Sequence, residues 1–171
     1  KDLESISTTI TQTVEKALLK HQEFALKEGR SMEDFIENSI EKITSSLSVI
    51  EKKFPVFKEQ LFDTLKERVS ELLQSALSTE DHKRLLTETA VYAEKADISE
   101  EIVRLKNHYK EFSKLIKKPT GTGKSMNFIL QEMHREINTI GSKFNTSEVI
   151  SDILLIKEEI EKCREIVQNI E

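Results

Sequence analysis

The sequence has 171 residues, of which 37% are hydrophobic, 33% charged and 6% aromatic, and its formal net charge is -5 at pH 7. This composition excludes an intrinsically disordered chain, and the negative charge argues against a protein that coats nucleic acid over its whole surface. No apolar run approaches the ~20 residues that span a bilayer. The single cysteine, Cys163, cannot form an internal disulfide and is expected to be a small buried side chain. We therefore expect a cytoplasmic protein with no membrane partner.

Glycine, proline and capping residues divide the chain into about seven helices. The first is predicted to end at Gly29, the second to span residues 31–54 behind a Ser31 cap, and the third to open at Pro55. Further helices are predicted at residues 79–96, 98–118, 125–143 and 147–171, the last one capped by Asn145. The fold class is all-α: long antiparallel helices that form helical hairpin arms, followed by a C-terminal helical bundle.

Two regions are expected along the chain. Residues 1–78 form a long helical arm region, and residues 79–171 form a C-terminal helical domain. The chain begins with Lys1, inside a pattern that is already helical, which suggests a piece of a longer protein.

Apolar stripes at helical spacing mark the two most regular of these helices. Residues 98–118 are predicted to bury Ile98, Ile102, Leu105, Tyr109, Phe112 and Ile116. Residues 125–143 are predicted to bury Met126, Ile129, Leu130, Met133, Ile137 and Ile140.

The stretch GTGKS from Gly121 to Ser125 looks like the end of a phosphate-binding loop. That motif needs a glycine where Lys118 stands and a buried strand before it, but the preceding residues have helical spacing. We therefore interpret GTGKS as a turn between two helices, and we expect no nucleotide cofactor.

Polar residues form rows beside the apolar stripes. Glu101, Arg104 and His108 lie three and four residues apart, so they share one edge of their helix. The next helix carries two rows: Gln131, Arg135, Asn138 and Ser142 opposite its buried stripe, and Glu132, Glu136, Thr139 and Lys143 beside it.

Carboxylates and a histidine from neighbouring helices suit Mg²⁺ or Mn²⁺, because hard cations prefer oxygen ligands and manganese also accepts imidazole. Helical bundles place such groups inward. The alternative is that Glu132 and Glu136 are an ordinary four-residue pair on an acidic helix.

A basic run extends from Arg104 to Lys124, with seven basic residues against the one acid Glu111. It is typical of a phosphate-binding surface. The alternative is that lysines near the end of a helix complement its dipole without any ligand.

Three stretches closely resemble the C-terminal part of the YicC/YloC family: AEKADISEEIVRLKNHYKEF at residues 93–112, GKSMNFILQEMHREINTIGSKFN at residues 123–145, and EIEKCREIVQNIE at residues 159–171. Weaker similarity extends upstream through HQEFALKEGRSMEDFIENSIEKI. The family begins with a strand-containing N-terminal half, which this sequence lacks.

The resemblance implies a bacterial, metal-dependent endoribonuclease that is associated with stress responses, acts on single-stranded or structured RNA and assembles as a homo-oligomer, with a hexamer expected. On this reading Glu101, Glu132 and Glu136 ligate Mn²⁺ or Mg²⁺, and His108 ligates metal or transfers a proton. The RNA-binding residues are Arg104, Lys124, Arg135, Asn138 and Lys143. The alternative is a non-catalytic helical module that oligomerises and holds RNA while the chemistry lies elsewhere, so the fragment itself is then inactive.

Overall fold

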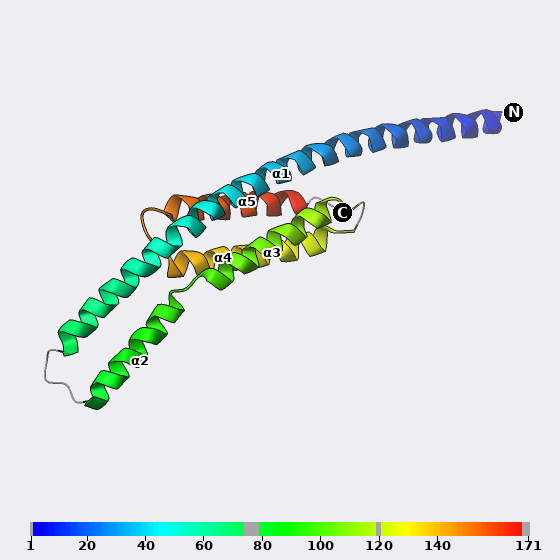
Figure 1. Ribbon diagram of the computed structural model, residues 1–171. Coiled ribbons are helices and arrows are strands. Elements are labelled where there is room, and N and C mark those ends of the chain that lie inside the picture. The colour runs from blue at the N-terminus through cyan, green and yellow to red at the C-terminus, as the bar shows by residue number, and fades with distance from the viewer. Residues whose placement is uncertain (1, 74–78, 119–120, 169–171) are drawn as a thin grey trace. The chain divides into compact units, whose positions relative to one another are not determined.

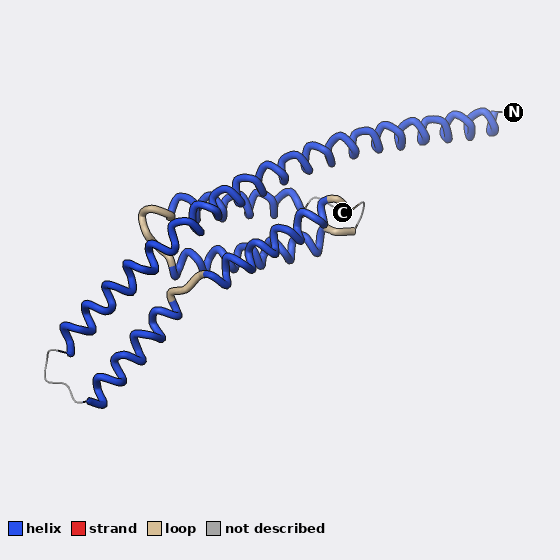
Figure 2. Tube along the Cα trace, viewed as in Figure 1, coloured by secondary structure: helices blue, strands red, loops and turns tan. Residues whose placement is uncertain are grey.

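The computed structural model describes residues 2–73, 79–118 and 121–168. Within these residues the chain forms helices and no strand (Figure 2). The five helices are α1 (Asp2–Leu73), α2 (Thr79–Lys95), α3 (Ser99–Ile116), α4 (Gly123–Lys143) and α5 (Ile150–Val167), as Figure 1 labels them. The all-α class is confirmed, whereas the predicted number of seven helices is wrong.

The difference lies in α1, which joins the three helices predicted before residue 74. These segments therefore cannot be antiparallel arms. Gly29 does not adopt a positive φ, and Pro55 lies inside the helix. Proline removes one backbone donor and costs a helix about 3 kcal/mol. Burial of the apolar row just before it, which is Ile43, Leu47, Ile50 and Phe54, offsets that cost because each such side chain contributes about 1.5–3 kcal/mol.

The chain divides into two compact units, Lys1–Asn38 and Ser39–Glu171. The first is the N-terminal part of α1, where Ile6, Ile10, Val14 and Leu18 recur every four residues and are each more than half exposed. The predicted boundary between residues 78 and 79 falls at the segment 74–78, which lies outside the described residues.

Within the second unit, α3, α4 and α5 are neighbours of alternating direction (Figure 1). The end of α4 meets the start of α3, because Lys143 Nζ lies 2.7 Å from Glu101 Oε1. The end of α4 also meets the start of α5, where a Cβ added to Gly141 would lie 3.2 Å from Ile153 Cγ2. Both pairs are therefore antiparallel.

The second half of α1 completes this bundle against α5. Lys42 Nζ lies 3.2 Å from Glu159 Oε1, and further along α1 the ammonium of Lys53 donates to the carbonyl of Glu148. Since the contacts advance from Lys42 to Lys53 along α1 while they go back from Glu159 of α5 to Glu148 just before its start, these two helices are also antiparallel.

The predicted apolar stripes form the centre of the bundle. All six predicted stripe residues of α4 are buried. On the predicted stripe before it, Ile98, Ile102, Leu105 and Phe112 are buried, while Tyr109 and Ile116 are half-buried. Cys163 is fully buried as expected, and burial raises the pKa of its thiol to about 11.

Helix ends follow the sequence at some places and not at others. The predicted start at Thr79 is confirmed, and Gly121 has a φ of +72°, as a glycine turn requires. Pro119, which directly follows the helix predicted at residues 98–118, lies outside the described residues. The predicted Asn145 cap is wrong, because α5 begins only at Ile150 and has no side-chain cap. Phe144 and Val149 are buried on either side of the turn, so core packing sets this connection.

Among the described residues, no helix combines the length and the apolar character needed to cross a membrane.

Candidate functional site

Three side chains from two helices converge on one edge of the bundle. His108 comes from α3, and Glu132 and Glu136 come from α4, four residues apart and therefore one above the other. One ligand atom from each residue lies within 4.8 Å of the other two. His108 and Glu132 are half-buried and Glu136 is 4% exposed. We call these three residues the α3/α4 cluster.

Two arginines flank the α3/α4 cluster without neutralising it closely. Arg104 Nη1 lies 3.8 Å from Glu136 Oε1, and Arg135 Nη1 lies 3.8 Å from Glu132 Oε2. Charge-assisted hydrogen bonds are about 2.7–2.9 Å long. Arg104 instead makes its short contact, 2.5 Å, with the exposed Glu100. The two carboxylates of the cluster thus keep capacity for another cation.

Glu101 lies apart from the cluster, although it shares its helix edge with His108. Its Oε1 accepts a hydrogen bond from Lys143 Nζ at 2.7 Å, and Lys143 also donates to the carbonyl oxygen of Asp97 at 2.9 Å. Both ends of this ion pair are largely buried, with side-chain exposures of 11% for Glu101 and 28% for Lys143. The carboxylate that was expected to ligate metal is therefore paired with a lysine that was expected to bind RNA.

The other candidate RNA-binding residues lie at the surface. Arg104 and Arg135 are 54% and 72% exposed at their side chains. Lys124 is exposed in the first turn of α4, and Asn138 is exposed one turn beyond His134, whose ring nitrogen Nδ1 lies 3.1 Å from Asn138 Nδ2.

Most side chains of the basic run are exposed to solvent. The members that the structure shows as exposed are Arg104, Lys110, Lys114, Lys117, Lys118 and Lys124. Lys106 is the exception, because its ammonium lies 2.6 Å from Glu51 of α1.

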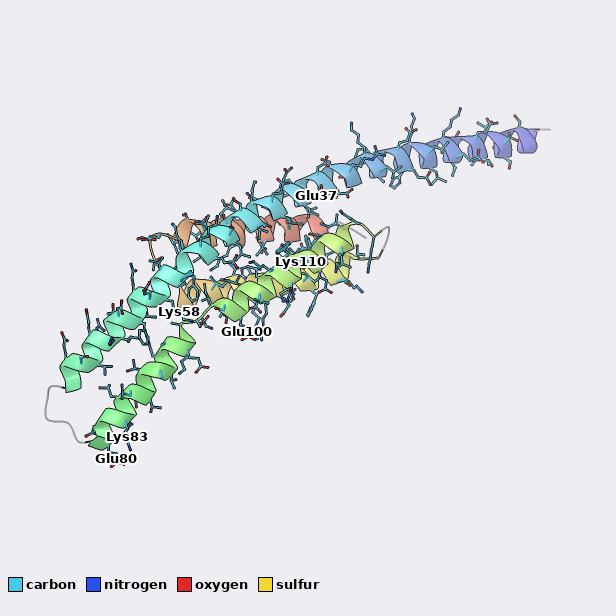
Figure 3. All side chains as sticks on the ribbon, in the orientation of Figure 1. Glu37, Lys58, Glu80, Lys83, Glu100 and Lys110 are labelled. Carbon is cyan, nitrogen blue, oxygen red and sulfur yellow. The ribbon has the colours of Figure 1, made fainter. Side chains whose placement is uncertain are left out.

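The connection between α2 and α3 gathers further charged groups that sequence patterns did not bring together. Lys58 of α1 forms an ion pair with Asp97, whose other carboxylate oxygen accepts the backbone N–H of Ser99 at 2.8 Å. Figure 3 shows Lys58 on the stretch of α1 beside this connection. The hydrogen bonds from Lys58 and Ser99 lower the pKa of Asp97 from 3.8 to about 2. No pattern in the sequence pointed to the pairing of Asp97 with Lys58, which lies 39 residues away.

Comparison with known proteins decides the family. Residues 50–171 match the family model described as "Endoribonuclease YicC-like, C-terminal". The chain belongs to the YicC-like family.

Two curated relatives, both named "Probable endoribonuclease YicC", are similar to this YicC-like chain over all of its 171 residues. The protein from Clostridioides difficile (strain 630) is 37% identical, and that from Haemophilus influenzae (strain ATCC 51907 / DSM 11121 / KW20 / Rd) is 27% identical. The chain spans 58% of the length of each relative.

The YicC-like bundle also contains a buried carboxylate that the sequence did not reveal. Glu159 of α5 is 3% exposed and lies 3.2 Å from Lys42 Nζ and 3.0 Å from Lys162 Nζ. Burial raises the pKa of Glu159, but interactions with Ser39, Lys162 and Lys42 outweigh this effect and leave the pKa below its ordinary value of 4.5. Lys42 and Glu159 are 117 residues apart, so no periodic pattern could have paired them.

An apolar hollow of about 350 Å³ lies between α1 and α2 of this YicC-like fold. Its walls include Phe54, Phe57 and Phe62 of α1 and Ala93 of α2. Charged groups contribute only Lys58 and Glu59 to its lining, and none of the α3/α4 cluster lines it. The chemistry of the cluster is therefore separate from this hollow.

Proposed function

We propose that this chain is the C-terminal helical part of a metal-dependent endoribonuclease and that the α3/α4 cluster is its metal site. The observation that carries the proposal is the convergence of His108, Glu132 and Glu136, whose ligand atoms lie within 4.8 Å of one another. The relatives named as endoribonucleases support the choice of RNA as substrate.

The donor set fits a hard divalent cation. Two carboxylates and an imidazole match Mn²⁺, and the oxygen ligands also suit Mg²⁺. Glu136 is almost fully buried, and the guanidinium of Arg104 stands 3.8 Å from its carboxylate. A buried carboxylate without a close counter-charge is unfavourable. Binding a cation between Glu136, Glu132 and His108 relieves that cost.

The bound cation would stabilise the negative charge that develops on the phosphodiester during cleavage. Arg104 and Arg135 flank the cluster and have long, weak contacts to its carboxylates, so both guanidinium groups can turn to an RNA phosphate. Lys124 and Asn138 extend this polar surface along α4. His108 either completes the ligand set or transfers a proton, since imidazole does both in enzymes.

The test is cleavage of a labelled single-stranded RNA by the full-length protein and by this chain, each with Mn²⁺ and with EDTA. We expect cleavage that needs Mn²⁺ and that falls at least ~100-fold in Glu136→Gln, since losing a group that acts on the transition state has effects of this size. The matched control is Glu111→Gln, which changes an exposed carboxylate on α3. Equal rates for Glu136→Gln, Glu132→Gln and wild type would refute the site.

A second candidate function is a module that holds RNA without cutting it. The exposed lysines of the basic run favour it, namely Lys110, Lys114, Lys117, Lys118 and Lys124. RNA affinity should then fall steeply as salt rises, because phosphate contacts release counterions. An affinity that stays constant between 50 and 200 mM salt would remove this role from the basic run.

The expected homo-oligomer is part of the same proposal. The exposed apolar row Ile6, Ile10, Val14 and Leu18 supports it, because contiguous exposed apolar surface often marks an interface. Ile10→Glu with Leu18→Glu should lower the mass measured by analytical ultracentrifugation. An unchanged mass would mean that this row is not the interface.

A further inference from the structure

We propose that Lys143 and Glu101 are positioning residues, whose ion pair fixes the axial register of α3 against α4 and thereby the spacing of His108 from Glu132 and Glu136. This inference rests on the proposed function, because it concerns the same cluster. It gives the pair a role other than ligating metal or binding RNA.

The first step is that the ion pair and the α3/α4 cluster have the same spacing along both helices. Glu101 is seven residues before His108 on α3, and Lys143 is seven residues after Glu136 on α4. Seven residues correspond to about 10.5 Å along a helix and nearly two whole turns. Because α3 and α4 are antiparallel, the register that pairs Glu101 with Lys143 also places Glu136 opposite His108. The ion pair and the cluster therefore belong to one register, about two turns apart.

The second step is the cost of leaving this register. Oε1 of Glu101 is held by Lys143, while its Oε2 is buried and has no hydrogen-bond partner in the structure. A shift of one residue moves a side chain about 1.5 Å along the axis and about 100° around it. That shift would leave the buried carboxylate of Glu101 without its counter-charge, which is strongly unfavourable. Apolar side chains tolerate such a change of partner better, since buried polar groups are the ones that specify register.

The third step is that Lys143 is itself anchored. Besides Glu101, its ammonium binds the carbonyl of Asp97, and the carboxylate of Asp97 is paired with Lys58. Asp97 also accepts the N–H of Ser99 at the start of α3. The end of α4 is thus tied both to the first turn of α3 and, through Asp97, to α1.

The experiment measures register and metal binding separately in the full chain. Spin labels at the exposed Val103 of α3 and Gln131 of α4 report the distance between the helices by pulsed electron paramagnetic resonance, with Cys163→Ala as background. Titration with Mn²⁺ alone reports affinity. The variants are Lys143→Met, Glu101→Gln, and the charge exchange Glu101→Lys with Lys143→Glu. Lys106→Met is the matched control, because it breaks an α3 ion pair of similar length, 2.6 Å, that joins α1 instead of α4.

We expect Lys143→Met to shift or broaden the label distance by about 1.5 Å, one residue of helix rise. Its Mn²⁺ affinity should fall roughly tenfold, as when outer partners of metal ligands are removed. The charge exchange should restore both quantities in part, because a glutamate at position 143 re-forms the ion pair but cannot donate to the carbonyl of Asp97. Lys106→Met should change neither quantity. Glu101→Gln leaves the ammonium of Lys143 with the carbonyl of Asp97 and with partial access to water, which costs less than a buried carboxylate without a partner. It therefore supplies the same comparison if Lys143→Met does not fold.

Three results would overturn the inference. One is an unchanged label distance in both single variants, even if their melting temperatures fall, because the pair would then contribute only stability. Another is tighter Mn²⁺ binding by Lys143→Met, which would make Glu101 a ligand released by loss of its lysine. A third is no recovery in the charge exchange. If wild type binds no Mn²⁺ while the label distance still shifts in Lys143→Met, the proposed metal site fails and the register role stands.

Discussion

Lys58 and Asp97 join α1 to the connection between α2 and α3, with Nζ of Lys58 2.5 Å from Oδ2 of Asp97. This pair holds the pKa of Asp97 at about 2 in the folded state, below its ordinary value of 3.8. A lowered pKa means that the ionised carboxylate stabilises the fold fully above about pH 4, and that this contribution disappears as the pH falls from 4 to 2.

We therefore expect Asp97→Asn to lower the free energy of unfolding by about 1 kcal/mol at pH 7, a modest value because Lys58 is 57% exposed and solvent screens the pair. The difference from wild type should shrink between pH 4 and pH 2. Denaturant titrations at pH 7, 4, 3 and 2 measure it. Lys58→Met should reproduce the neutral-pH loss, and a gap that stays constant down to pH 2 would contradict the assignment.

Glu159 and its lysines should respond unequally to substitution. Replacing Lys42 and Lys162 together by Met leaves the buried carboxylate without a cation and should cost about 3 kcal/mol at pH 7. Glu159→Gln should cost only about 1 kcal/mol, since the partly exposed lysines regain water.

The stability deficit of the double lysine variant should depend on pH. Without the lysines, burial of Glu159 outweighs its remaining interaction with Ser39 and raises its pKa, so protonation relieves the double variant as the pH falls. Its deficit should be smaller at pH 4 than at pH 7 in chemical denaturation. Glu158→Gln, which alters the more exposed partner of Lys162, is the control and should change stability by about 0.5 kcal/mol or less. Equal losses in the lysine and glutamate variants would refute this account.

Pro55 offers a test of the continuity of α1. Inside a helix, proline lacks the N–H donor and crowds the carbonyl four residues earlier. We expect Pro55→Ala to raise the free energy of unfolding by about 1–3 kcal/mol and to raise the midpoint of thermal unfolding followed by circular dichroism. The exposed neighbour change Val56→Ala should add about 0.5 kcal/mol or less. If a separate helix began at Pro55, its removal would give no gain, because proline is favourable at a first helical position.

Gly29 and Gly141, which both lie inside helices, should behave in opposite ways. A Cβ at Gly29 meets no atom within 4 Å, so Gly29→Ala should stabilise α1 by about 0.5–1 kcal/mol. A Cβ at Gly141 would stand 3.2 Å from Cγ2 of Ile153, which is only 1% exposed and would have to shift within the core. Gly141→Ala should therefore lower stability by about 1 kcal/mol. Hydrogen exchange around Gly29 and thermal unfolding of the Gly141 variant measure the two effects, and equal gains would contradict the close packing of α4 on α5.

Sequence periodicity predicted all six buried apolar residues of α4, from Met126 to Ile140, because one buried face imposes a 3.6-residue period. It did not predict the burial of Glu136 on the same helix. It also placed Glu101, Arg104 and His108 on one edge. It failed for α1, since the rules for glycine and proline are local preferences. The burial of Ile43, Leu47, Ile50 and Phe54 in the bundle offsets the cost of Pro55. Gly29 lies in an exposed stretch of α1, so packing does not explain why the helix continues through it.

Within the candidate site, periodicity predicted which polar residues share a row on one helix. It did not predict which residues of α3 contact which residues of α4. The row of Glu132, Glu136, Thr139 and Lys143 is half-buried or buried, and the row of Gln131, Arg135, Asn138 and Ser142 is exposed, as expected. The partner of Glu101 depends on how α4 is aligned with α3, which no single helix encodes. The contact between Lys58 and Asp97 could not be predicted either, because it depends on how α1 is aligned with the connection between α2 and α3.

The alignment of α3 with α4 also limits where the chain can change its length. A residue inserted after Gly121 lengthens a turn and leaves both helices intact, at an entropic cost of a few tenths of a kcal/mol, roughly. The same insertion between Glu136 and Lys143 would rotate one of them by about 100° relative to the other, so that only one could face its partner on α3. The seven-residue interval in each helix therefore has a fixed length, whereas an insertion after Gly121 leaves the pairing of α3 with α4 unchanged.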